Sequence, residues 1–257
     1  MSNLESGPGK LQRFSSGDFR RAKEILLKAS PDDPAANKLP KHEWEFYNRK
    51  APSHNAEGIG DIAEAAVFST LDHEKSPLHS FGNVQVSVEL ASRADDILKG
   101  IDGVLRVSSK GQELAQIGYD ATTNPGAVMR KMEEALFYPK DPSRTRIILG
   151  FDISSANSPW QNVREGSFSA PSFLLLLKEA ETQLRVHEDY AQKTGDTERM
   201  RRCQRELLFV HYTLQHTPEA MPKALLQDKV FVAIQKAASE ILSTDPGSFR
   251  TGRAKAA

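Results

Sequence analysis

Two neighbouring stretches decide the fold of this chain: KGIDGVLRV at Lys99–Val107 and LAQIGYDATT at Leu114–Thr123. Both have the composition of β-strands, and the polar segment between them carries a glycine, Gly111, near its middle. We therefore expect an antiparallel hairpin. If it folds about Gly111, Asp102 on the first strand lies opposite Asp120 on the second.

Two opposed aspartates in a hairpin need a physical explanation. Directly opposite residues have Cβ atoms about 4.5–5.5 Å apart, and two carboxylates that close repel each other unless a cation or a proton lies between them. A divalent cation with oxygen ligands, Mg²⁺ or Mn²⁺, is the simplest remedy. The alternative is that Asp102 is only a turn or strand-start residue between Gly100 and Gly103.

The flanking sequence supplies further elements. A helix is predicted over 57–71, and its residue Glu64 is a third candidate acid; we expect this helix to cover the sheet face that carries Asp120. The Val84, Val86 and Val88 alternation predicts a half-buried strand, and 91–98 is expected to be a loop or short turn. A helix over 125–137 and a buried strand over 145–153 follow.

From about residue 171 the chain has a helical pattern, with helices expected over 171–194, 197–216 and from 221 or 222 to 242. The predicted fold is α/β, with a small mixed sheet of about four strands flanked by helices and a C-terminal helical extension. The expected divisions are a disordered tail at 1–15, a core with N-terminal helices at 16–160, a helical extension packed on it at 161–245, and a basic disordered tail at 246–257.

The order of helix, three strands, helix and strand, together with these acids, resembles the PD-(D/E)xK nuclease superfamily. The resemblance covers roughly 57–153 and implies a restriction-endonuclease-like core. It implies that Glu64 is the helix acid, that Asp102 is the first strand aspartate, and that Asp120 is the acid of the acid-x-lysine pair. Uncharacterised bacterial proteins of nuclease-like type look similar, and many have Asp-x-Thr at the third strand.

The chain departs from the superfamily pattern at the lysine, because Thr122 stands in its place. That lysine helps orient the attacking water and stabilises charge on the phosphoryl oxygens, which a neutral hydroxyl cannot do. A cation supplied from elsewhere in the chain could replace it. We expect Lys131, on the helix after Thr122, to do so, ahead of Lys99.

The balance of charged residues limits the kinds of partner that the chain can attract. Lys and Arg together equal Asp and Glu in number, so no overall field attracts nucleic acid, and contact with a polyanion requires a local patch such as 199–205. A solvated helix face is the alternative for that cluster.

The lone Cys203 excludes an internal disulfide. No stretch has the roughly 20 apolar residues of a membrane span, and without a signal-peptide core the cytoplasm is expected.

The resemblance thus implies a nuclease that hydrolyses phosphodiester bonds with Mg²⁺ or Mn²⁺, and DNA is favoured over RNA. The expected site residues are Glu64, Asp102, Asp120, Thr122 and Lys131, with Asp102, Asp120 and Glu64 as the metal ligands. The alternative is an inactive nuclease-like fold that binds nucleic acid or protein. A third interpretation is a helical interaction protein whose sheet is only a scaffold. The C-terminal helices could form a bundle on the sheet, or a surface for a homodimer or protein partner.

Overall fold

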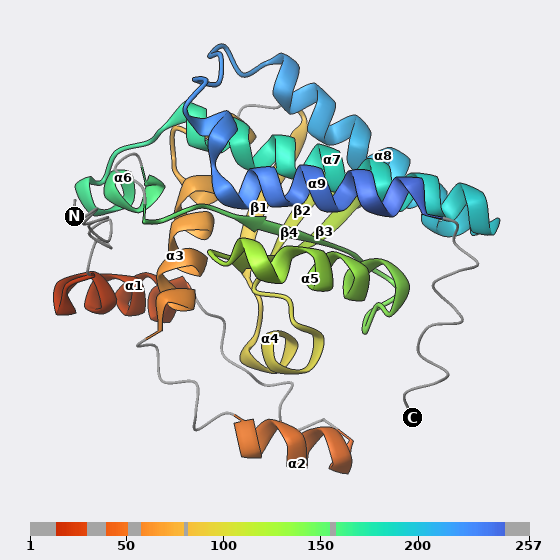
Figure 1. The fold of residues 1–257 in the computed structure, drawn as a ribbon, viewed down its shortest axis with the longest axis horizontal. Helices are drawn as coiled ribbons and strands as arrows, with labels where there is room; N and C mark the ends of the chain where they lie inside the picture. Colours follow the sequence, from red (N-terminus) through yellow and green to blue (C-terminus); the bar gives the residue numbers. More distant parts are fainter. Residues whose placement is uncertain (1–13, 30–39, 51–57, 80–81, 155–157, 245–257) are drawn as a thin grey trace, which may run out of the picture.

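The computed structural model describes residues 14–29, 40–50, 58–79, 82–154 and 158–244. It confirms an α/β fold, in which a four-stranded mixed sheet lies between helices and the long C-terminal helices pack on the sheet (Figure 1). Both predicted disordered tails fall outside these residues, apart from Phe14 and Ser15. No helix in the described part of the chain combines the length and apolarity needed to cross a membrane.

The sheet has the strand order β1-β2-β3-β4, with bounds Val84–Leu90, Gly103–Ser109, Gln112–Thr122 and Thr145–Gly150. The first three strands are antiparallel, and β3 and β4 are parallel. A parallel pair needs a crossover connection, and helix α5, Pro125–Phe137, provides it. Asn124 caps α5 as predicted, because its side chain accepts the Gly126 N–H at 3.0 Å.

The β2–β3 hairpin has the predicted register where it matters for the site. Its turn consists of Lys110 and Gly111, both with positive φ, as a tight two-residue hairpin turn requires. From Gly103 opposite Tyr119 to Val107 opposite Ala115 the pairing follows the prediction, and a bulge then shifts it by one residue. Asp102 precedes β2 by one residue, and its N–H donates to the Tyr119 carbonyl at 2.8 Å.

The other α-helices of the described residues are α1 Ser16–Ala29, α2 Lys41–Lys50, α3 Ile59–Asp72, α4 Arg93–Lys99, α6 Pro159–Glu165, α7 Ala170–Thr194, α8 Thr197–Gln215 and α9 Lys229–Ser243. Two of them correct the sequence prediction. The expected loop after β1 is helix α4, begun by a cap from Ser92 to the Asp95 N–H. Helix α9 starts later than expected, because Asp228 caps it by accepting the Val230 and Phe231 N–H groups.

The two faces of the sheet are covered by different helices. Helices α3, α7 and α8 pack on the face that carries Ile117 and Tyr119, and α5 packs on the face that carries Asp120 and Ile148. The expectation that α3 covers the Asp120 face is therefore wrong. Its buried stripe is mostly apolar, running from Ile62 to Leu71, and it packs against the apolar side of β3 rather than the polar one.

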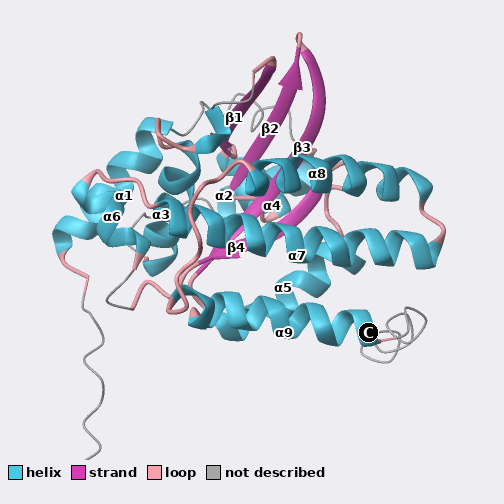
Figure 2. Ribbon diagram, turned by 90° about the horizontal axis from the view of Figure 1, so that it is seen from above, coloured by secondary structure: helices cyan, strands magenta, loops and turns pink. Residues whose placement is uncertain are grey.

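Helix α7 closes the free edge of the sheet. The Gln183 amide group accepts the Ile148 N–H at 2.7 Å and donates to the Ile148 carbonyl at 2.6 Å, while Glu179 accepts the Gly150 N–H at 2.9 Å. These side chains hydrogen-bond to backbone groups at the edge of β4 that could otherwise pair with a strand from another chain. Figure 2 shows α7 between α8 and α9, so the C-terminal helices form a layer packed on the sheet.

Candidate functional site

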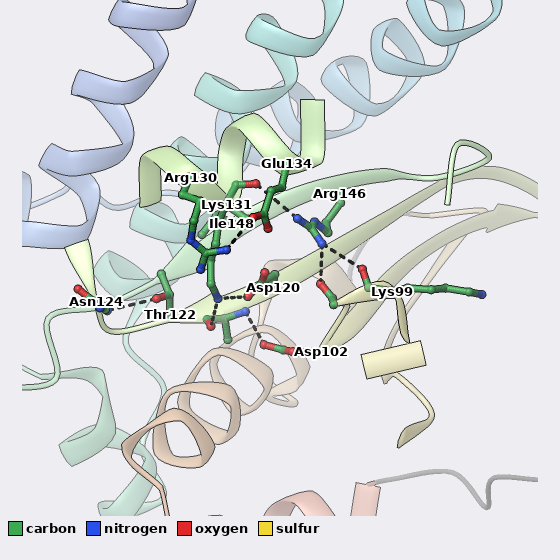
Figure 3. A network of polar contacts seen from close by, with 12 residues as sticks. Lys99, Asp102, Asp120, Thr122, Asn124, Arg130, Lys131, Glu134, Arg146 and Ile148 are labelled. Atoms are coloured by element: carbon green, nitrogen blue, oxygen red, sulfur yellow. Dashed lines mark hydrogen bonds and ion pairs between the residues drawn. The ribbon is translucent and has the colours of Figure 1, made fainter. Parts of the chain in front are cut away.

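Asp102 lies where the chain enters β2, at the end of the sheet reached by the last residues of β3. Its Oδ2 accepts the Ala121 N–H at 2.6 Å, so the carboxylate takes the place that β2 backbone would occupy beside β3 (Figure 3). Burial raises the pKa of Asp102 well above its usual value, and Asp120 and Glu64 raise it further. The group is therefore held among other acids, with one oxygen committed to the backbone.

Asp120 is buried near the end of β3 and points toward α5. The Nζ of Lys131 pairs with its Oδ1 and lies 3.5 Å from the Ala121 carbonyl oxygen (Figure 3). Lys131 is placed there because it lies about two turns into α5, on the helix face that meets the sheet. The structure thus brings a cation to Asp120, beside which the neutral Thr122 provides none.

Glu64 approaches from α3, on the other side of the sheet. Burial raises the pKa of Glu64 to about 8, and Asp96, Asp61 and Asp120 add to the shift because they are like charges. The three predicted acids come from a helix, a strand start and a strand end, and the like charge of Asp120 raises the pKa of both Glu64 and Asp102. Carboxylates that raise one another's pKa are typical of functional sites, because a bound cation can relieve the repulsion between their charges.

The remaining predicted residues have different surroundings. Thr122 Oγ1 accepts the Asn124 N–H at 3.2 Å, so this hydroxyl helps shape the turn into α5. Lys99 pairs with Asp95 at 2.6 Å and lies 3.8 Å from Asp141, away from Asp120. Of the two lysines weighed from the sequence, only Lys131 contacts the acid.

The candidate ligands in this site are carboxylate oxygens, which are the donors that a hard divalent cation prefers. Among the residues the structure describes, however, no three His, Cys, Asp or Glu side chains are grouped closely enough to hold a metal ion together. Asp102 uses Oδ2 for the backbone and Asp120 uses Oδ1 for Lys131, so the second oxygen of each is the one suited to an ion. A metal held by this pair would share Asp120 with the Lys131 ammonium.

Sequence reasoning missed Tyr119 as part of this site. Its hydroxyl is buried and has no hydrogen-bond partner in the described structure, and burial, Glu64 and Asp102 raise its pKa well above the usual value. Gly103 lies opposite it in the hairpin, and a Cβ there would collide with the ring and hydroxyl. The sequence did contain a signal for this contact, because the predicted hairpin register places Gly103 opposite the aromatic Tyr119.

The predicted basic cluster does not form one open surface. Arg199 donates to the Leu136 carbonyl at 2.9 Å and lies 2.7 Å from His187 Nδ1, and Arg202 donates to Thr145 Oγ1 at 3.2 Å. Arg201 and Arg205 are exposed. Half of the cluster thus joins α8 to the core, and only the exposed pair could follow phosphates.

Comparison with known proteins adds no assignment: no protein-family model matches the sequence, and neither a curated protein nor a solved structure gives a match. The site is therefore judged on its own geometry.

Proposed function

We propose that this protein hydrolyses phosphodiester bonds in nucleic acid, with DNA favoured over RNA, using a divalent cation. One observation carries the proposal: the like charge of Asp120 raises the pKa of both Glu64 and Asp102, and the Lys131 ammonium pairs with Asp120. The three acids occur in the chain order that the resemblance to PD-(D/E)xK nucleases implies.

The residues divide the work as follows. Asp102 and Asp120 would hold Mg²⁺ or Mn²⁺, which when bound polarises the scissile phosphate and lowers the pKa of a bound water. Lys131 supplies the positive charge that Thr122 cannot, and it stabilises charge on the phosphoryl oxygens. Glu64 has a pKa of about 8 and can hold or release a proton near neutral pH, which suits a group that orients the attacking water.

A second candidate is an inactive fold of the same type that binds nucleic acid or protein. Two observations favour it: the Lys131 ammonium already neutralises Asp120, and the described carboxylates do not form a ready three-ligand metal site. In that case the exposed Arg201 would contribute to salt-sensitive binding without turnover.

We also propose that the C-terminal helices bind a second copy of the chain or another protein, and that the protein is located in the cytoplasm.

The deciding experiment is a cleavage assay on single- and double-stranded DNA and RNA with Mg²⁺ or Mn²⁺, using the wild type and Asp120→Asn. The proposal predicts a loss of roughly three orders of magnitude or more in Asp120→Asn, with a thermal melt near that of the wild type. Glu179→Gln is the matched control, because it changes another buried carboxyl on α7, and it should cleave normally. Cleavage that survives in Asp120→Asn would show that the chemistry lies elsewhere.

A further inference from the structure

A separate small cavity lies between α1, the C-terminal end of α3 and the segment that joins α6 to α7. Its volume is about 170 Å³. Its polar lining consists of Arg21, Ser69, Thr70, His73, Asn162, Ser167 and Ser169. None of Glu64, Asp102, Asp120 and Lys131 lines this cavity, so it is distinct from the carboxylate cluster.

The charge of the cavity is positive. Arg21 contributes a guanidinium, and none of the described residues that line the cavity is Asp or Glu. Arg21 Nη2 donates to the Val163 carbonyl at 3.0 Å, which uses one of the five N–H groups of the guanidinium and fixes its position. An anchored guanidinium in a cavity without acids favours an anionic ligand.

Neighbouring groups add hydrogen-bond donors. His73 Nδ1 accepts the Lys75 N–H at 3.2 Å, so the hydrogen of the neutral ring is assigned to Nε2, and the ring lies 5.4 Å from that of Phe168. Ser169 Oγ accepts hydrogen bonds from the N–H and the hydroxyl of Ser172, which leaves its own hydrogen to donate. Guanidinium, imidazole N–H and hydroxyl donors around one small space match the oxygens of a phosphate group.

We propose that this cavity binds a phosphate group. Its volume lies below the roughly 300–1,000 Å³ of sites for drug-sized ligands, so it takes the phosphate itself rather than a whole cofactor. The phosphate could be a free anion or the terminal phosphate of a nucleotide chain, since both present the same oxygens. The inference goes beyond the proposed nuclease activity, because it does not depend on the carboxylate cluster.

The test is titration calorimetry with inorganic phosphate at constant ionic strength, on the full chain and its variants. Arg21→Gln should weaken binding about tenfold or more, because it removes a charge-assisted contact. Arg20→Gln is the matched control: it removes an equal charge from the adjacent, exposed position on α1 and should leave binding unchanged. Ser167→Glu keeps Arg21 and adds a carboxylate to the lining, and it should abolish binding with an unchanged thermal melt.

A second titration uses a short oligonucleotide with a 5′-phosphate and the same oligonucleotide with a 5′-hydroxyl. Tighter binding of the phosphorylated strand than of inorganic phosphate, lost in Arg21→Gln, identifies a nucleic-acid end as the ligand. Equal affinity for both phosphates identifies a free anion. Absence of phosphate binding by the wild type, or an equal loss in Arg20→Gln and Arg21→Gln, overturns the proposal.

Discussion

The parallel strands β3 and β4 end beside two different groups of buried acids. At the end of β4, each acid serves the backbone: Glu179 accepts the Gly150 N–H at 2.9 Å, and Asp228 accepts the Asp152 N–H at 2.8 Å and caps α9. At the end of β3, Asp102 also accepts a backbone N–H, from Ala121. There, however, the like charges of Asp120 and Glu64 raise the pKa of Asp102, and Lys131 pairs with Asp120.

This difference shows what separates a structural acid from a candidate functional one. Burial raises the pKa of Glu179 well above its usual value, just as it does for Asp102, so a raised pKa alone does not distinguish the two places. The distinguishing feature is the weight of the like charges: at Asp102 the effects of Asp120 and Glu64 on the pKa exceed that of the backbone hydrogen bond, whereas at Glu179 the Gly150 hydrogen bond outweighs Asp228. The β4 group is accounted for by strand and helix ends that need acceptors.

Among the tests of this comparison between the two groups of acids, the largest effect is expected from removing the Lys131 ammonium. Lys131→Met should reduce cleavage by roughly 10²–10³-fold, because it removes the only cation that the described structure brings to Asp120. It should also destabilise the fold by about 1–3 kcal/mol, because it leaves Asp120 buried without its partner. Rates from the cleavage assay and urea unfolding measure the two effects separately.

Two variants control this prediction. Lys99→Met removes a cation that pairs with Asp95 instead, and it should change the rate little. Adding Thr122→Lys to Lys131→Met restores the acid-x-lysine spacing and should recover part of the activity. If Lys99→Met were as damaging as Lys131→Met, the assignment of Lys131 would be wrong.

A smaller effect is expected in the dependence of stability on pH. The pKa of Glu64 is raised from 4.5 to about 8 in the folded protein, so the native state keeps a proton that the unfolded chain releases. The free energy of unfolding should therefore fall as the pH rises from about 4.5 to 8, without divalent ions. In Glu64→Gln this contribution is absent.

Urea unfolding of the wild type and Glu64→Gln at pH 5, 6.5 and 8 measures that contribution as a difference. The variant should gain stability relative to the wild type as the pH rises. A difference that stays constant across this range would mean that the folded protein does not raise the pKa of Glu64 by burial and neighbouring charges.

The smallest effect is expected at the β4 edge. Glu179→Gln should be close to neutral for stability and cleavage, because the amide oxygen can still accept the Gly150 N–H. Glu179→Leu removes that acceptor and should cost about 1–3 kcal/mol, measured by thermal unfolding, without a specific loss of cleavage. A loss of cleavage in the stably folded Glu179→Gln variant would remove the contrast between the two groups of acids.

Much of the fold could be predicted from local sequence. The glycine turn at Gly111 set the hairpin register, and the Asn124–Pro125 pair marked the start of α5, because both act through a few neighbouring residues. The start of α9 was missed because Asp228 is its cap, while the proline at 222 suggested an earlier beginning. Helix α4 was missed because it is short and rich in charge.

The site residues stay a prediction, and their packing was not evident from the sequence. The structure pairs Lys131 with Asp120, and Asp102 accepts the N–H of the next residue, Ala121. Which sheet face α3 covers depends on long-range packing of Ile62 against Tyr119, and alternation along a strand does not reveal it. The roles of Arg199 and Arg202 in joining α8 to the core likewise depend on contacts distant in sequence.

The most direct test of the account is calorimetric titration of Mn²⁺ and Mg²⁺ into the wild type, the Asp102→Asn/Asp120→Asn double variant and the Glu179→Gln control. The account predicts binding to the wild type and to Glu179→Gln, and its loss in the double variant while the fold persists. Absence of binding by the wild type, or binding that persists in the folded double variant, would contradict the claim that the acids at the end of β3 form a metal site.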